Sequence, residues 1–170
     1  LTQLSKKVID TNADLGIAVD PDVDRLVFVC ENGEIFGEEN TLVACSDYVL
    51  EKSPGSTVSN LSSSRALADI TKKHNQIHFY SAVGEVNVVK KMKECSAVIG
   101  GEGNGGVIYP KSHYGRDALV GIGLFLSLFV ERGLKASQLL DTYPKYYMLK
   151  EKINLSSETN VDKILKKIAK

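Results

Sequence analysis

The sequence has no excess of charge of either sign. Its 170 residues include 21 Lys and Arg and 21 Asp and Glu, so the formal net charge at pH 7 is zero. This balance gives no electrostatic reason to expect binding to nucleic acid or to an anionic membrane, because both usually depend on a basic surface. We therefore expect neither as a partner.

The sequence also lacks long apolar runs and closely spaced cysteines. The longest apolar run, residues 119–130, is well short of the ~20 residues that a membrane-spanning helix needs. The N-terminal stretch LTQLSKKVID has helical apolar spacing and no signal-peptide pattern. Cys30, Cys45 and Cys95 lie far apart in apolar surroundings, which is typical of reduced core cysteines. We expect a cytoplasmic protein.

The sequence contains instead a regular alternation of strand and helix patterns. Hydrophobic residues make up 43% of the chain, enough for a substantial core. Strand patterns lie at residues 15–19, 26–30, 34–36, 56–61, 77–80, 97–99 and 107–109. Helical spacing marks residues 1–8, 42–49, 65–74, 88–95, 117–131 and 161–168. This rhythm predicts an α/β fold, a three-layer α/β/α domain with a mixed, mostly parallel sheet.

Both ends of the chain depart from this rhythm. One helix and two strands precede the regular alternation, and we expect them to be a remnant of a preceding domain. At the other end, in the segment YYMLKEKINLSSETNVDKILKKIAK, residues 146–170, an edge-like strand runs into an amphipathic helix at 161–168. The helix at 117–131 is apolar on nearly every side, which predicts burial on more than one face. We expect both ends to belong to neighbouring domains.

Three aspartates alternate in the segment DPDVDR, between two apolar strands. In an extended strand Asp20, Asp22 and Asp24 would be about 6.6 Å apart per step, too far for one cation to bridge. The segment must therefore curl, and Pro21 favours a bend. Carboxylates brought within roughly 4 Å repel by about 4 kcal/mol per pair at an effective dielectric of 20. A divalent cation removes that cost, and oxygen ligands favour Mg²⁺, Mn²⁺ or Ca²⁺ over zinc.

Two other interpretations of this segment remain. The three aspartates and Glu31 occupy positions 1, 3, 5 and 12 of an EF-hand loop, but position 6, which needs glycine, is Arg25. A strand pattern also follows directly, where an EF-hand loop would continue. The plainer alternative is a solvated turn rich in aspartate, in which Arg25 neutralises one carboxylate by itself.

A second feature is the glycine-rich stretch GGEGNGGVIYP, residues 100–110. Its glycines fit the dinucleotide fingerprint G-x-G-x-x-G, but a strand pattern ending at Pro110 follows where that fingerprint requires a helix. The loop instead presents one carboxylate, Glu102, and one amide, Asn104, which together can bind neighbouring hydroxyls of a sugar. The structural alternative is a tight β-turn with incidental polar residues.

Together, these segments resemble the α-D-phosphohexomutases. DPDVDR, residues 20–25, resembles the family's metal loop D-G-D-G/A-D-R, and GEGNGG, residues 101–106, resembles its sugar loop in the form G-E-x-N-G-G. Between them, VGEVNVVKKM, residues 83–92, is similar to a family loop that opens a helix. The loops stand in the family's order, and the resemblance covers nearly the whole chain.

The resemblance implies part of a four-domain enzyme. Residues 1–33 would be the C-terminal part of domain 2 with the metal loop, 34–147 domain 3 with the sugar loop, and 148–170 the lead into domain 4. The family's phosphoserine loop, T-A-S-H-N-P, and its phosphate clamp, R-x-S-x-T-E, are absent from this sequence. It follows that the chain would be inactive alone, with the remaining domains of the same full-length chain as its partners.

The implied reaction interconverts hexose 1-phosphate and hexose 6-phosphate. An enzyme phosphoserine gives its phosphoryl group to the sugar, and the resulting bisphosphate returns the other one. By the resemblance, Asp20, Asp22 and Asp24 would hold Mg²⁺ beside the phosphoserine. Arg25 would be the catalytic arginine that steadies the phosphoryl group or the metal loop.

The resemblance also implies the sugar-binding residues. Glu102 and Asn104 would hold hydroxyls of the hexose phosphate substrate, with Gly84 and Glu85 as further substrate-binding residues. Glu85 and Gly106 stand where some members of the family have histidine, so the sugar remains open among glucose, mannose and glucosamine. We favour a phosphomannomutase or phosphoglucomutase, with phosphoglucosamine mutase as the alternative. We expect the two loops to act separately, so that Glu102→Gln weakens turnover and leaves metal binding intact.

Two alternatives of other classes remain. One is a non-catalytic module that binds a metal or a sugar phosphate. The other is a phosphatase of the haloacid dehalogenase type, whose D-x-D motif also follows a strand and binds Mg²⁺, although the triple aspartate and the glycine loop fit that type poorly. Among smaller features, Arg116 and Asp117 are expected to start the apolar helix, with a role in ligand binding as the alternative. Residues 62–65, SSSR, predict helix capping or a phosphate-binding nest.

Overall fold

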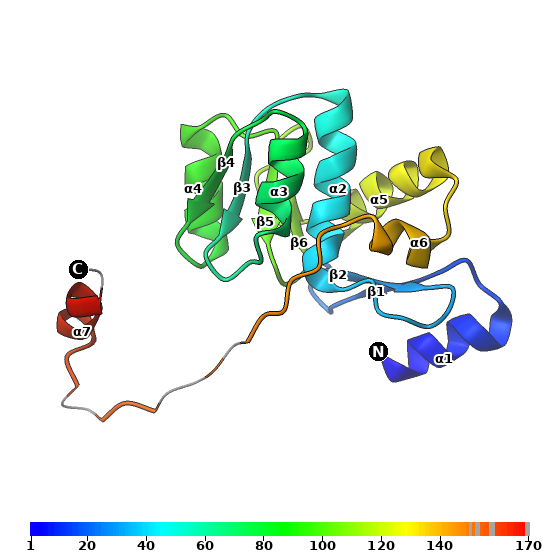
Figure 1. Cartoon of the computed structure of the whole chain (residues 1–170), viewed down its shortest axis with the longest axis horizontal. Helices are drawn as coiled ribbons and strands as arrows, with labels where there is room; N and C mark the ends of the chain where they lie inside the picture. The colour runs from blue at the N-terminus through cyan, green and yellow to red at the C-terminus, as the bar shows by residue number, and fades with distance from the viewer. Residues whose placement is uncertain (150, 152–153, 157–158, 169–170) are drawn as a thin grey trace.

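The computed structural model describes residues 1–149, 151, 154–156 and 159–168 (Figure 1). Its strands are β1 (Leu15–Val19), β2 (Leu26–Cys30), β3 (Thr57–Asn60), β4 (His78–Ser81), β5 (Ile99–Glu102) and β6 (Gly106–Ile108). Its helices are α1 (Thr2–Thr11), α2 (Glu38–Lys52), α3 (Ala66–Lys73), α4 (Glu85–Glu94), α5 (Ala118–Arg132), α6 (Ala136–Asp141) and α7 (Val161–Ile168). The predicted alternation of strands and helices is confirmed, and among the elements of the described residues only α6 was not predicted.

The main sheet has four strands in the order β4-β3-β5-β6. Strand β3 runs parallel to both β4 and β5, whereas β5 and β6 are antiparallel. Strands β1 and β2 form a separate antiparallel pair in which Leu15 lies opposite Cys30 and Val19 opposite Leu26. The prediction of a mixed, mostly parallel sheet is confirmed.

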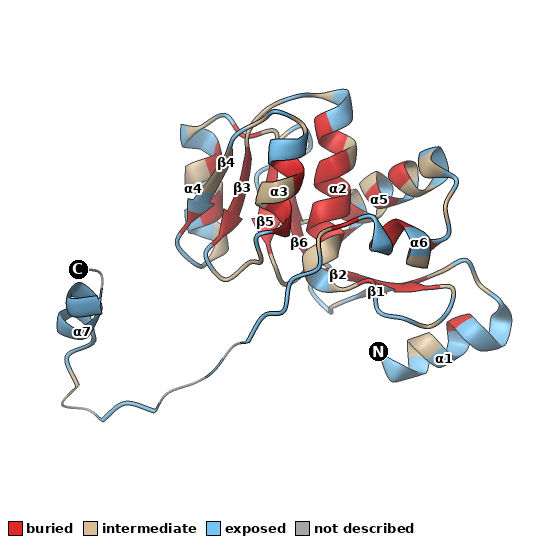
Figure 2. Ribbon diagram, in the orientation of Figure 1, coloured by how far each residue is buried: buried red, intermediate tan, exposed pale blue. Residues whose placement is uncertain are grey.

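Helices cover both faces of the main sheet. Successive residues of a strand point to opposite faces, so the sheet borders a core on each side. Ile99 and Val107 pack with helices α2 and α3, whereas Val58 and Ile108 pack with Val88 of helix α4 and its neighbours. Figure 2 shows α2 as the most completely buried helix. The three-layer α/β/α architecture is therefore confirmed.

Strand β2 belongs to the same core as helices α2 and α5. All five of its residues are buried. The ring of Phe28 stacks on that of Phe125 at 3.8 Å between centroids, and Phe36 meets Phe125 edge-on at 5.0 Å. The segment that carries the predicted metal loop is thus fixed to the larger domain by aromatic packing.

Two predicted strands differ from the structure for identifiable reasons. Gly100 and Gly101 lie inside β5, although the sequence placed the strand before them. A Cβ atom at Gly101 would lie 2.0 Å from the carbonyl oxygen of Gly106, so this close pairing of β5 with β6 requires glycine. Residues 34–36 form only an isolated bridge between Ile35 and Val29.

The C-terminal part confirms one expectation and corrects another. Helix α7 forms where the apolar spacing predicts it, and none of its residues is buried. The edge-like strand expected between residue 146 and the helix does not form in the described residues of 146–160, and residues 150, 152–153 and 157–158 lie outside them. Helix α5 buries Phe125 and Leu128 in the core of this chain, whereas Leu119 is 68% and Val130 78% exposed, so the described residues cover one face of the helix and leave the other open. Among the described residues, no helix is long and apolar enough to cross a membrane.

The aromatic contact between β2 and α5 predicts a large effect of truncation. Phe125→Ala should lower the free energy of unfolding by about 3–5 kcal/mol, because the side chain is fully buried against Phe28 and Phe36. Leu119→Ala on the exposed face of the same helix should change it by less than about 0.5 kcal/mol. Urea denaturation measures both variants, and equal losses would contradict this account of the core.

The stability should also depend on pH through His78. Burial lowers the pKa of His78 to about 4, and its ring nitrogens meet Thr57 Oγ1 at 2.8 Å and Ser59 Oγ at 3.1 Å. In the unfolded chain, His78 takes up a proton near the ordinary histidine pKa of about 6.5. The contribution of the neutral His78 ring to stability is therefore fully present above that pH and is lost as the pH falls toward 4. The free energy of unfolding should be smaller at pH 5.5 than at pH 7.0, and His78→Gln should reduce this difference. A loss of the same size in both proteins would exclude His78 as its source.

Candidate functional site

The segment Asp20–Arg25 forms a tight turn between β1 and β2. The backbone N–H of Val23 donates to the carbonyl of Asp20 at 3.0 Å, and that of Asp20 donates to the carbonyl of Arg25 at 3.3 Å. Val23 has φ 56°, an unusual value for a β-branched residue and a sign of local strain. Its carbonyl accepts a hydrogen bond from Ala118 N at the start of α5. The curled loop that the sequence predicts is confirmed.

Arg25 holds the first aspartate of the loop. Asp20 Oδ2 accepts from Arg25 Nε at 2.8 Å, and Asp20 Oδ1 accepts from the backbone N–H groups of Asp24 and Arg25 at 3.1 and 3.2 Å. Desolvation alone would raise the pKa of Asp20, but these hydrogen bonds lower it to about 2. The Asp20 carboxylate is therefore ionised and fixed in the turn.

The other two aspartates have different surroundings. Asp24 Oδ2 forms an ion pair with Arg116, whereas Asp24 Oδ1 is buried without a hydrogen bond in the described structure and has Arg25 Nε at 3.6 Å. Burial and the neighbouring Asp20 carboxylate raise the pKa of Asp24, against the effect of Arg116. Asp22 is exposed at the tip of the turn. Two carboxylates as close as Asp20 and Asp24 repel when both are ionised, which a nearby cation would relieve.

The residues present suit a hard divalent cation in their chemistry. All three candidate ligands are carboxylates, and the buried Asp24 Oδ1 has an unused acceptor. Within the described residues, however, no three His, Cys, Asp or Glu side chains are already gathered as ligands. Asp22 would therefore have to turn toward Asp20 and Asp24 for all three to bind one ion.

The glycine-rich loop, residues 103–105, joins β5 to β6. It lies against the turn at residues 20–25, here called the aspartate loop. Leu26 N, just after that loop, donates to the carbonyl of Gly105 at 3.2 Å. Gly105 has φ 86°, and a Cβ atom there would lie 2.2 Å from the Leu26 carbonyl oxygen. Strand β6 follows the loop, as expected, in place of the helix of a dinucleotide site. The glycines therefore allow the two loops to meet backbone to backbone.

Glu102 is one of the few buried acids among the described residues, with 5% of its surface exposed. Glu102 Oε1 accepts from Asn60 Nδ2 at 2.6 Å and from Gly84 N at 3.3 Å. Glu102 Oε2 accepts from Arg116 Nη1 at 2.9 Å. Both oxygens thus have protein partners, which fix the carboxylate at the carboxyl end of β5.

Asn104 lies at the edge of an open pocket of about 390 Å³. Asp20, Arg25, Glu38 and Gly103 are among the residues that line the same pocket. Asn104 Oδ1 accepts from Gly106 N at 3.2 Å, which orients the amide. The structure therefore brings Asp20 and Arg25 of the aspartate loop to one pocket with Asn104 of the glycine-rich loop.

Arg116 is the residue whose role the sequence did not reveal. Its guanidinium forms ion pairs with Asp24, with Glu102 at 2.9 Å and with Glu85 at 3.3 Å. Its backbone N–H donates to Glu85 Oε1 at 3.1 Å. Asp117 caps α5 as expected by accepting from Val120 N. The sequence offers one signal for such a residue: the segments DPDVDR and GEGNGG together carry four acids and one basic residue, Arg25.

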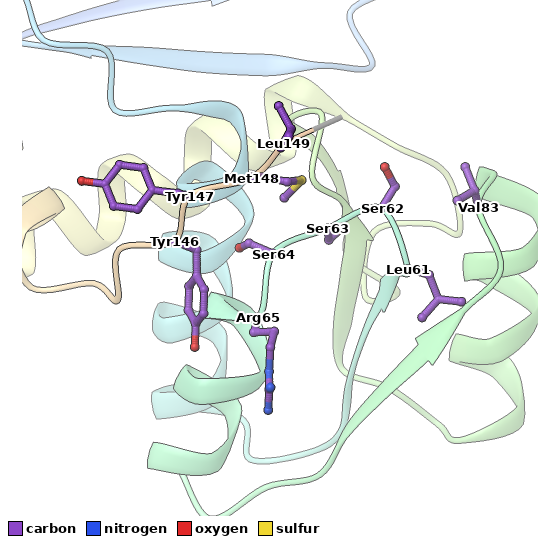
Figure 3. A pocket seen from close by; sticks show the side chains of 10 residues that line it. All are labelled: Leu61, Ser62, Ser63, Ser64, Arg65, Val83, Tyr146, Tyr147, Met148 and Leu149. Carbon is purple, nitrogen blue, oxygen red and sulfur yellow. The ribbon is translucent and has the colours of Figure 1, made fainter. Parts of the chain in front are cut away.

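A second cavity, of about 470 Å³, lies beside the start of α3 (Figure 3). The segment Ser62–Ser64 runs between Tyr146 on one side and Leu61 and Val83 on the other. Ser63 Oγ accepts from Gly103 N at 2.9 Å, and Ser64 Oγ accepts from Ala66 N at 3.3 Å. The N-cap residue of α3, Arg65, makes no side-chain cap bond, so the capping interpretation of SSSR is not confirmed, whereas the Ser63 bond ties the segment to the glycine-rich loop.

Comparison with known proteins identifies the domain. Residues 38–146 match the family model described as phosphoglucomutase/phosphomannomutase, alpha/beta/alpha domain III. The phosphoglucomutase/phosphomannomutase of Thermococcus kodakarensis is 37% identical over 147 residues, which are 86% of this chain and 32% of that protein. A probable phosphoglucosamine mutase of Methanopyrus kandleri is 34% identical over 159 residues, 93% of this chain and 35% of that protein.

A solved structure gives the same result. The crystal structure of a phosphoglucomutase/phosphomannomutase family protein from Burkholderia thailandensis superposes with a TM-score of 0.75 at 27% identity, covering 85% of this chain and 32% of that one. The chain thus spans about a third of the length of these relatives. The fold, the family model and the identity agree, and the chain belongs to the α-D-phosphohexomutase family.

Proposed function

We propose that this chain supplies the metal-binding and sugar-binding loops of a cytoplasmic phosphohexomutase. The enzyme would interconvert hexose 1-phosphate and hexose 6-phosphate through a phosphoserine and a bisphosphate intermediate. The observation that carries the proposal is the direct contact of the two loops, through the hydrogen bond from Leu26 N to the Gly105 carbonyl. The chain has neither a phosphoserine loop nor a phosphate clamp of the family type, so we expect it to need the remaining domains for activity.

The aspartate loop is proposed to bind Mg²⁺ through Asp20, Asp22 and Asp24. A bound Mg²⁺ would supply positive charge beside the phosphoryl group during transfer. Arg25 holds Asp20 in the turn and is half exposed, with 51% of its side-chain surface accessible. Its guanidinium can therefore keep the loop in shape and also meet a phosphoryl oxygen.

The glycine-rich loop is proposed to bind the sugar. Because Asn104 Oδ1 is fixed by Gly106 N, its Nδ2 group is available as the donor to a hydroxyl at the pocket. Glu102 retains lone pairs beside its protein partners and lies next to Gly84 and Glu85 at the start of α4. A site that binds the sugar hydroxyl groups, with the phosphate groups bound elsewhere, suits a reaction in which the sugar binds in two orientations.

The sugar is proposed to be mannose or glucose, with glucosamine as the alternative. The Thermococcus relative is named as a phosphoglucomutase/phosphomannomutase, whereas the Methanopyrus relative is named as a probable phosphoglucosamine mutase. Turnover of mannose 1-phosphate, glucose 1-phosphate and glucosamine 1-phosphate by the complete enzyme distinguishes them. Activity with none of the three would leave a binding module as the better description.

The aspartate loop predicts a specific loss on neutralisation of Asp22. Asp22→Asn should weaken Mg²⁺ binding by at least the roughly 10-fold that loss of an outer-shell partner costs, because it removes a direct ligand. In the complete enzyme it should remove most of the Mg²⁺ dependence of turnover. Since Asp22 is exposed, the free energy of unfolding should change little.

A matched control is available on the same hairpin. Asp14 is also exposed, but it precedes β1 at the end opposite to Asp20. Asp14→Asn should leave Mg²⁺ affinity unchanged in a titration under the same conditions. If the two variants respond to Mg²⁺ alike, the aspartate loop is not the metal site.

A further inference from the structure

The guanidinium of Arg116 lies among three acids that come from three separate segments of the chain. Asp24 belongs to the aspartate loop, Glu85 to the start of α4 and Glu102 to the end of β5, where the glycine-rich loop begins. Only 20% of the Arg116 side-chain surface is exposed, so these ion pairs are screened less than surface pairs. The planar guanidinium can hold carboxylates from different directions at once, which a lysine ammonium does less well.

Asp24 has two competing uses at this position. In the structure its Oδ2 pairs with Arg116, whereas the proposed function requires the same carboxylate to bind a divalent cation. A guanidinium and a divalent cation on one carboxylate repel each other. Binding of the cation therefore weakens the hold of Arg116 on Asp24, and a firm Arg116–Asp24 pair weakens binding of the cation.

Glu102 competes with Asp24 for the same Arg116 guanidinium. Its Oε2 accepts from Arg116 Nη1 at 2.9 Å, so it draws part of the guanidinium charge toward the glycine-rich loop. Without the Glu102 charge, Arg116 would be attracted more strongly to Asp24. Without Asp24, Arg116 would be attracted more strongly to Glu102. The two acids are linked through one shared cation.

We propose that Arg116 is a positioning residue that couples binding of a divalent cation by the aspartate loop to the placement of Glu102 beside the glycine-rich loop. When the cation binds Asp24, Arg116 pairs only with Glu102 and Glu85 and holds the start of the glycine-rich loop more firmly. This inference rests on the proposed function, because it needs the aspartate loop to bind a cation. It also replaces the expectation that Glu102→Gln leaves metal binding intact.

The test is a double-mutant cycle in which the affinity for Mn²⁺ is measured. Free Mn²⁺ is followed by its electron paramagnetic resonance signal in the 170-residue chain, in Arg116→Gln, in Glu102→Gln and in the double variant. Arg116→Gln should bind Mn²⁺ about fivefold more tightly, the lower end of measured coupling between sites. Glu102→Gln should bind about fivefold more weakly in the otherwise unchanged chain, and most of that effect should disappear in the double variant.

A control separates this coupling from a plain effect of charge. Glu38 lines the same pocket as Asp20 and Asn104, so Glu38→Gln also removes one negative charge near the loop. Its effect on Mn²⁺ affinity should be the same with and without Arg116. If Arg116→Gln does not fold, Arg116→Lys serves in its place, and the effect of Glu102→Gln should shrink there because an ammonium holds two separate carboxylates poorly.

The possible results distinguish this inference from the proposed function. If Glu102→Gln weakens Mn²⁺ binding equally with and without Arg116, or has no effect at all, the coupling is excluded. Should Asp22→Asn still abolish Mn²⁺ binding in that case, the proposed metal loop stands without it. If the unchanged chain binds no Mn²⁺, both the metal loop and the coupling are overturned.

Discussion

The backbone contact between Leu26 and Gly105 is the constraint on which the site depends. It joins a strand of the β1–β2 pair to a turn of the four-stranded sheet, two units that share no strand. Only a residue without a side chain fits at Gly105, because a Cβ atom there would meet the Leu26 carbonyl at 2.2 Å. The packing of Phe28 on Phe125 holds β2 at this distance. Core packing thus sets the spacing of the two loops, and glycine permits it.

The position of the site follows from the direction of the strands. Asn60 and Glu102 lie at the carboxyl ends of the parallel strands β3 and β5, and they are hydrogen-bonded to each other. Helix α4 begins at the same edge with Gly84 and Glu85. Ligands of open α/β sheets generally bind outside the carboxyl ends of the strands. The glycine-rich loop occupies that edge, and the aspartate loop is added from the neighbouring strand pair.

How much could be predicted from sequence depended on the range of the signal. Apolar periodicity located most of the helices and strands, because a buried face repeats every few residues along the chain. The turn at Asp20–Arg25 was predictable from its crowded charges and Pro21. The shift of β5 to include Gly100 and Gly101 was not, because it depends on a close approach to Gly106 and Met92 that no local pattern encodes.

Arg116 shows the same limit at the level of the site. It directly precedes Asp117, the residue that caps α5 by accepting from Val120 N, so its local sequence signal is only that of a helix start. Its partner Asp24 lies far from it along the chain, on the turn between β1 and β2, and Glu102 lies 14 residues before it, at the end of β5. The excess of acids in the loops indicates that a basic side chain lies nearby, but only the fold determines that this side chain is Arg116. An arginine at this point allows acids from three separate segments to approach closely, so the folded chain holds Asp24, Glu85 and Glu102 together through one guanidinium.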